Sequence, residues 1–178
     1  MKKSFALLVV CMLVIGLLAG CGGGDKKPAA PAAPAADKKV FVNIATGGTA
    51  GVYYPLGGAM AEIFNKNIPG MNASAQSTGA SVANINLIKD GKVEVALVQN
   101  DIAYYAANGT EMFKDKKVEA IQGIASLYNE TIQIVTIEGK GIKTVADLKG
   151  KRVAVGALGS GTEANARQIM EIFGITYA

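Results

Sequence analysis

A glycine-rich turn near the start of the chain is a candidate anion site. The stretch IATGGTAGVYYPLGGAM, residues 44–60, places five glycines between an apolar run and a helical pattern. Such a turn leaves backbone N–H groups free at a helix N-terminus, where they favour a negative charge. It is no P-loop, because no Gly-Lys-Ser/Thr follows, and it lacks the dinucleotide fingerprint. We predict that Gly48, Thr49, Gly51, Tyr53 and Tyr54 bind a small anion or carboxylate, the alternative being a turn without a ligand.

A second glycine turn lies near the other end of the chain. Residues 159–164, GSGTEA, match G-x-G-x-x-A between a predicted strand and a predicted helix. Taken alone, this match favours an NAD-type enzyme, but the acidic residue expected about 20 positions further on would lie beyond residue 178. Gly159, Ser160, Gly161 and Thr162 are therefore candidates for ligand binding, whichever ligand it is.

Three further polar clusters follow predicted strands. Ligands of open α/β sheets collect outside the carboxyl ends of the strands, although each cluster could instead be a plain helix N-cap. The candidate binding residues are Ser77, Thr78, Gly79, Ser81, Asn84, Gln99, Asn100, Asp101 and Tyr128.

The rare residue types limit the chemistry that the chain can perform. It has no histidine, and its two cysteines are Cys11 and Cys21. A His-based catalytic triad and most zinc sites need these residues. We therefore expect no catalytic residue, no metal and no cofactor.

The first 39 residues are typical of an exported lipoprotein. Lys2 and Lys3 precede an apolar run of about fifteen residues, short for a membrane-spanning helix, which needs roughly 20. The ending LLAGC resembles a bacterial lipobox, which implies cleavage after residue 20 and a lipid on Cys21. Residues 21–39, rich in Ala and Pro, read as a disordered tether. The folded part would thus lie outside the cytoplasm, anchored to the membrane.

The charge of the exported part excludes one class of partner. Two of the 18 basic residues leave with the signal, so the remaining ones nearly balance the 14 acidic residues. A nearly neutral domain gives no reason to expect nucleic acid binding.

From residue 40 onward, the pattern alternates between strands and helices. We predict strands at 40–45, 71–77 and 93–99, two more within 121–137 around a turn at Asn129-Glu130, and another at 152–157. Helices follow the first three strands and the last one. The predicted inward faces are Leu56, Met60, Ile63 and Phe64; Val82, Ile85 and Ile88; and Ala166, Ile169, Met170 and Phe173. Asn100 or Asp101 should cap the third helix. This order predicts an α/β fold with a mainly parallel sheet.

Four stretches together resemble the TAXI family, the solute-binding proteins of TRAP transporters. They are IATGGTAGVYYPLGGAMAEIFN, STGASVANINLIKDGKVEVALVQNDIAYYA, LYNETIQIVT and DLKGKRVAVGALGSGTEANARQIM. The resemblance implies a periplasmic-binding-protein-like (type II) fold, with a first lobe at 40–138 and the start of a second lobe at 139–178. It also implies TRAP permease subunits as partners, and a small organic acid or amino acid, such as glutamate, held in the cleft. We expect a monomer.

The positions of the two arginines limit which ligands the first lobe can bind. Arginine occurs only at Arg152 and Arg167, so the first lobe offers no guanidinium fork to a carboxylate. Asp101 could instead accept an amine, which favours a zwitterion or a modest acid. Two other classes stay open, the binding component of an ATP-driven importer and an exported enzyme.

Overall fold

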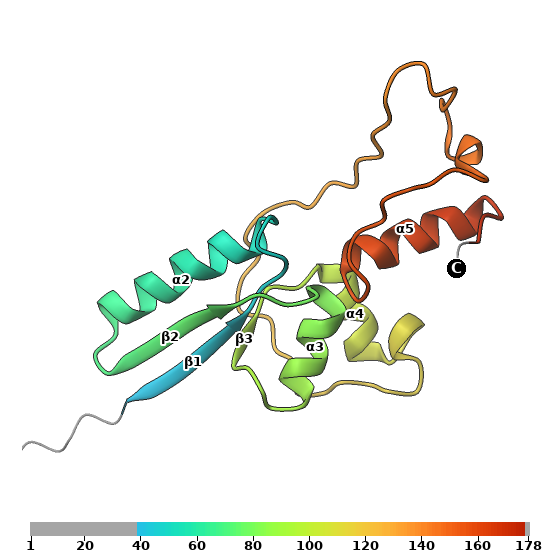
Figure 1. The fold of residues 1–178 in the computed structure, drawn as a ribbon. Helices are drawn as coiled ribbons and strands as arrows, with labels where there is room; N and C mark the ends of the chain where they lie inside the picture. Colours follow the sequence, from blue (N-terminus) through green and yellow to red (C-terminus); the bar gives the residue numbers. More distant parts are fainter. Residues whose placement is uncertain (1–38, 177–178) are drawn as a thin grey trace, which may run out of the picture. The chain divides into compact units, whose positions relative to one another are not determined.

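Three parallel strands form a small sheet (Figure 1). They are β1 (Val40–Ala45), β2 (Met71–Gln76) and β3 (Val95–Ala96), in the order β2-β1-β3. β1 pairs with β2 along its whole length, from Val40 opposite Met71 to Ala45 opposite Gln76. The predicted mixed α/β class with a parallel sheet is confirmed.

The computed structural model describes residues 39–176. The predicted signal segment 1–20, the lipidation site Cys21 and the tether up to residue 38 lie outside this range. All described residues fall within one compact unit, 37–178, and the predicted lobe boundary at residue 139 stays a prediction. No helix in the described range is long and apolar enough to span a membrane.

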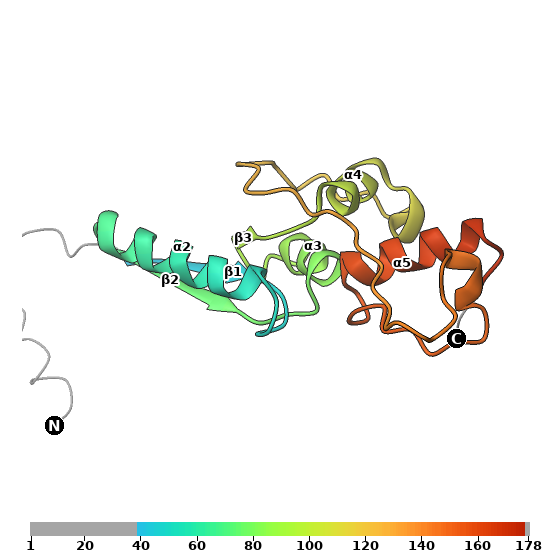
Figure 2. The same ribbon diagram turned by 90° about the horizontal axis from the view of Figure 1, so that it is seen from above.

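Helix α2 (Tyr53–Asn67) covers one face of the sheet and closes its outer edge. It runs beside β1 and β2 in two perpendicular views (Figures 1 and 2). Ala61 of α2 packs with Ile44 and Ala73 in one buried cluster. The Asn65 side chain donates to the Ala73 carbonyl (2.9 Å) and accepts from the Ala73 N–H (2.6 Å). Asn65 therefore satisfies both backbone groups of Ala73 at the outer edge of β2, where they would otherwise be open to pairing with another chain.

A second cluster is built from helices. It joins α3 (Ser81–Lys89), α4 (Asn100–Asn108), the 3₁₀ turn Glu111–Phe113 and the first half of α5 (Gly161–Ile172). Ala164 of α5 is buried there beside residues of α3 and α4. The second half of α5 packs on the 3₁₀ turn Val145–Leu148, where Leu148, Met170 and Ile175 are buried together. The start of α5 is thus fixed against α3 and α4.

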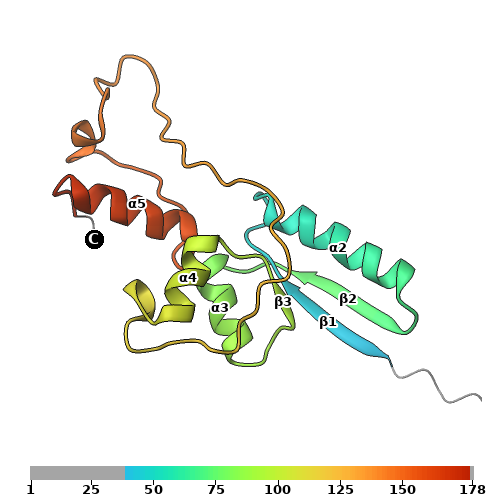
Figure 3. The same cartoon turned by 180° about the vertical axis from the view of Figure 1, so that it is seen from behind.

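Several predicted strands are wrong. Within 121–137 the chain is irregular and mostly exposed, and 152–157 is irregular as well. Figure 3 shows the long connection between α4 and α5 without a strand arrow. Extended, β-branched sequence becomes a strand only when a neighbour completes the ladder, and among residues 39–176 no strand pairs with these segments. The third strand is also shorter than predicted: Val95 and Ala96 pair with β1, and before them the Asn43 N–H donates to the Glu94 side chain (2.7 Å) instead of to a backbone carbonyl.

The predicted helix faces and caps need smaller corrections. Ile63 is 57% exposed, because α2 turns Gly57 and Ala61 towards the sheet instead. Phe173 lies beyond the end of α5 and is 50% exposed. The N-cap residue of α4 is Gln99, and its side chain makes no capping bond. The predicted caps are wrong, because Asn100 and Asp101 both lie within the helix, where Asp101 accepts the N–H of its neighbour Ile102.

Candidate functional site

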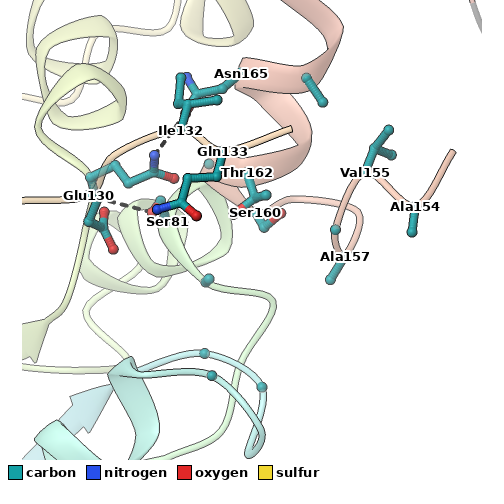
Figure 4. Close-up of a pocket in the computed structure, with 18 of the residues that line it drawn as sticks. Ser81, Glu130, Ile132, Gln133, Ala154, Val155, Ala157, Ser160, Thr162 and Asn165 are labelled. Carbon is teal, nitrogen blue, oxygen red and sulfur yellow. Dashed lines mark hydrogen bonds between the residues drawn. The ribbon is translucent and has the colours of Figure 1, made fainter. Parts of the chain in front are cut away.

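A cavity of about 860 Å³ opens where β1 and β3 end. It is lined by the starts of α2, α3 and α5, by part of the irregular stretch 128–135, and by residues 153–157 (Figure 4). Eleven predicted binding residues line it: Gly48, Gly51, Tyr53, Thr78, Gly79, Ser81, Gln99, Tyr128, Ser160, Gly161 and Thr162. The other seven lie outside the lining: Thr49, Tyr54, Ser77, Asn84, Asn100, Asp101 and Gly159. The two glycine turns, more than 100 residues apart in sequence, meet at this cavity.

Three helices begin at the cavity, and their first turns differ in their hydrogen bonds. At α5, the Ser160 hydroxyl accepts the Glu163 N–H at 3.1 Å. At α3, the Gly159 carbonyl accepts the N–H groups of Val82 (3.1 Å) and Ala83 (3.3 Å). At α2, the cap is Val52 and no side chain bonds the first turn. Since the first N–H groups of a helix have no partner within it, the first turn of α2 offers N–H donors at the cavity, whereas the first turn of α3 is bonded and that of α5 is bonded in part.

The hydroxyl groups at the start of α3 hold the fold together. Each of these hydroxyls has a protein partner. Ser77 donates to the Gly47 carbonyl (3.0 Å) and Thr78 to the Asn84 side chain (2.6 Å), while Ser81 accepts the Gln99 N–H (3.1 Å). These bonds fix the loop between β2 and α3 against the ends of β1 and β3.

Asn84 is buried and lies outside the cavity lining. Its Nδ2 donates to the carbonyls of Thr46 (2.6 Å) and Leu97 (2.8 Å), and its Oδ1 accepts from Thr78. The side chain is 0% exposed, and both of its donor hydrogens are used. Asn84 therefore ties the carboxyl ends of β1 and β3 together.

A row of amide and carboxylate groups joins α5 to α4. Gln99 Nε2 donates to Asn165 Oδ1 (2.8 Å), and Asn165 Nδ2 donates to Asp101 Oδ2 (2.6 Å). A Cβ on Gly161 would overlap the Gln99 side-chain amide. Gly161 thus serves close packing. Asp101, a predicted amine acceptor, bonds Ile102 and Asn165 and lies outside the cavity lining.

Glu130 enters the cavity between two tyrosines. The Tyr53 hydroxyl donates to Glu130 Oε2 (2.9 Å) and the Tyr128 hydroxyl donates to Oε1 (2.8 Å). Burial raises the pKa of Tyr53 well above its ordinary value, and the hydrogen bond to Glu130 raises it further. Desolvation and the same carboxylate raise the pKa of Tyr128 to about 12. Both hydroxyls therefore stay protonated donors at neutral pH.

The family of the chain is shown by its match to a family model. The model of the NMT1-like family matches residues 44–178. The chain belongs to the NMT1-like family. This is a family of periplasmic solute-binding proteins related to the binding proteins of TRAP transporters, and its members are generally not enzymes. A small-molecule solute and a membrane transporter are thus the partners that the family implies, outside the cytoplasm.

The charge of the cavity lining limits which solutes this member of the NMT1-like family can bind. Glu130 is the one charged residue among the described residues that line it, and no lysine or arginine is among them. Arg167 pairs instead with Glu163 on α5 (3.5 Å). No group of three or more His, Cys, Asp or Glu in residues 39–176 could hold a metal ion.

Sequence reasoning missed Glu130 and the apolar part of the cavity. The apolar part includes Ile132, Ile134, Val155, Ile169 and Met170. A signal for Glu130 was present, since it directly follows Tyr128-Asn129 at a predicted turn. The apolar residues gave no such signal, because they were expected to be buried in strands and in a helix face.

Proposed function

We propose that this chain is the TAXI-type receptor of a TRAP transporter, which binds a small organic acid or an amino acid and delivers it to the membrane permease subunits. One observation carries the proposal. In a chain of a solute-binding family, polar groups from the starts of three helices converge on one cavity at the carboxyl ends of parallel strands. Ligands of open α/β sheets bind at that position.

The size and lining of the cavity suit a small solute. Its volume of about 860 Å³ lies within the range of small-molecule sites, about 300–1,000 Å³. Tyr53 and Gln99 offer polar contacts, and the uncapped first turn of α2 offers N–H groups to a carboxylate. In the proposed mechanism, a type II second lobe closes over the solute as hinge-type binding proteins do.

The test has a binding arm and a transport arm. Native mass spectrometry of the purified chain should detect a retained small molecule, and calorimetric titration should give a saturable affinity for it. Uptake of that solute in cells should require the chain together with TRAP permease subunits, and should persist when ATP-driven importers are absent. Uptake that depends on an ATPase would refute the TRAP assignment. Turnover of the solute by the purified chain would refute the receptor role.

Anchoring is a separate part of the proposal. We propose that Cys21, in the LLAGC ending, carries a lipid that holds the receptor at the outer face of a membrane. Labelled palmitate should be incorporated into the parent chain and lost in Cys21→Ser, while Cys11→Ser, a matched control within the signal, should keep the label. Equal labelling of the parent and Cys21→Ser would contradict a lipid at this cysteine.

A further inference from the structure

We propose that Glu130 accepts the ammonium group of the solute, so that the cavity selects an amino acid with an uncharged, apolar side chain. This inference rests on the proposed receptor function and narrows its ligand. Three features of the cavity carry it: the orientation of the Glu130 carboxylate, the absence of basic residues among the described lining residues, and the apolar wall.

The Glu130 carboxylate is oriented and still has acceptor capacity. Tyr53 and Tyr128 each donate to a different oxygen, at 2.9 and 2.8 Å. A carboxylate oxygen can accept two hydrogen bonds, so one position on each oxygen remains. Glu130 also lies on an exposed stretch, where an incoming solute can reach it. An ammonium group carries three donors and no acceptor, which suits these remaining positions.

The charges around the cavity disfavour an anionic solute. A solute carboxylate beside Glu130 would be repelled, and within the described lining no lysine or arginine would compensate it. Arg167 is paired with Glu163, and Arg152 does not line the cavity. A zwitterion avoids this repulsion, because its ammonium group can lie at Glu130 while its single carboxylate lies at the uncapped start of α2. A second carboxylate, as in glutamate, would have no partner.

An apolar wall completes the site. Ile132, Val155, Ile169 and Met170 line the cavity together with Glu130. Figure 4 shows Glu130 and Ser81 at one side of the cavity, and Val155 and Ala154 at the other. A solute with an ammonium group at one end and a hydrocarbon chain at the other matches this distribution, since burial of the chain removes apolar surface from water.

The test compares ligands that differ in one group. L-Leucine, 4-methylpentanoate (leucine without its amino group) and L-glutamate are titrated by calorimetry into the full chain, into Glu130→Gln and into Glu138→Gln. Glu138 is a matched control, eight residues further along the same exposed segment and outside the cavity lining. Leucine should bind the parent and Glu138→Gln equally. Loss of the charge-assisted bond should weaken its binding to Glu130→Gln about 10- to 150-fold. 4-Methylpentanoate should bind the parent more weakly than leucine does, with no further loss in Glu130→Gln.

The outcomes separate this inference from the receptor function. If 4-methylpentanoate binds the parent as tightly as leucine, or if leucine binds Glu130→Gln as tightly as the parent, the role of Glu130 is wrong and the receptor function stands. If glutamate binds more tightly than leucine, the selection for an apolar side chain is wrong. If the parent binds none of the three ligands and retains no small molecule in mass spectrometry, both the receptor function and this inference are overturned. Circular dichroism of each variant confirms that it is folded.

Discussion

Replacing Asn84 with alanine should lower the free energy of unfolding by about 2–4 kcal/mol. The side chain is fully buried and makes three hydrogen bonds, two to the carbonyls of Thr46 and Leu97 and one from Thr78. Asn84→Ala removes all three bonds and leaves a void in their place. The loss is expected to be structural, because Asn84 lies outside the cavity lining.

The magnitude follows from which partners remain bonded. The Thr46 carbonyl keeps a donor, because the Thr78 hydroxyl is also within 3.0 Å of it. Leu97 loses the donor to its carbonyl, and an unsatisfied buried carbonyl costs about 1–3 kcal/mol. The void adds roughly 1 kcal/mol. A domain of this size is stable by about 5–15 kcal/mol, so the variant should still fold.

Equilibrium unfolding in urea, followed by circular dichroism, measures the effect. With a slope of about 2 kcal/mol per M, the midpoint should fall by roughly 1–2 M. Asn86→Ala is the control on the same helix, because Asn86 is exposed and bonds only within α3, to the Val82 carbonyl. It should shift stability by no more than about 0.5 kcal/mol. An unchanged midpoint for Asn84→Ala, with weakened binding of the solute, would show that Asn84 contacts ligand and that the structural reasoning is wrong.

Three further predictions concern the cavity lining. Gly161→Ala should destabilise the protein by about 1–3 kcal/mol in urea unfolding, because its Cβ would displace the Gln99 amide from its hydrogen bond to Asn165. Gly48→Ala meets no atom within 4 Å and should be nearly neutral. Ala80→Gly should raise the thermal midpoint, because Ala80 has φ 68° and ψ −147°, a conformation that costs a non-glycine residue about 1–3 kcal/mol. Tyr128 should form tyrosinate only near pH 12, and earlier in Glu130→Gln, as followed by near-ultraviolet absorbance. Its raised pKa means that its contribution to stability is complete below the unfolded-state value of about 10 and is lost as pH rises towards 12.

Each of these three predictions would be contradicted by a specific result. Equal stability of Gly161→Ala and Gly48→Ala would contradict the close packing at α5. A lower midpoint for Ala80→Gly would show that the loop before α3 is unstrained. A Tyr128 titration that does not change in Glu130→Gln would mean that the carboxylate leaves the pKa of that hydroxyl unaffected.

The helices and the first two strands could be predicted because their signals are local. An apolar stripe at helical spacing or a β-branched run next to a turn depends on neighbouring residues only. The strands predicted in 121–137 and 152–157 failed because a strand is a property of a pair. VFVNIA at 40–45 becomes β1 since β2 and β3 flank it, whereas IQIVT, residues 132–136, has similar composition and no paired neighbour in the described chain.

The candidate site could be predicted only in part. The turns at Gly48 and Gly161 line one cavity, but the strand predicted before Gly161 does not form, so the rule that ligands collect at strand carboxyl ends accounts for the first turn only. The sequence could not separate residues that line the cavity from buried residues outside the lining. Asn84 is fully buried, although the apolar pattern predicted only Val82, Ile85 and Ile88 as the inward face of this helix. The turn at Asn129-Glu130 was predicted, but the hydrogen bond between Glu130 and Tyr53 spans 77 residues of sequence, so no local pattern predicts that these two side chains meet.

The irregular stretch between α4 and α5 has a consequence for the solubility of the protein. Residues 131–137, TIQIVTI, carry no charge, no proline and no glycine, and Ile132, Ile134, Val135 and Ile137 are each more than half exposed. Uncharged β-prone segments of six or seven residues are the sequence signature of cross-β aggregation. Concentrated samples should therefore self-associate through this segment, and a charged residue at Val135, which is 85% exposed, should suppress the association with little effect on the fold.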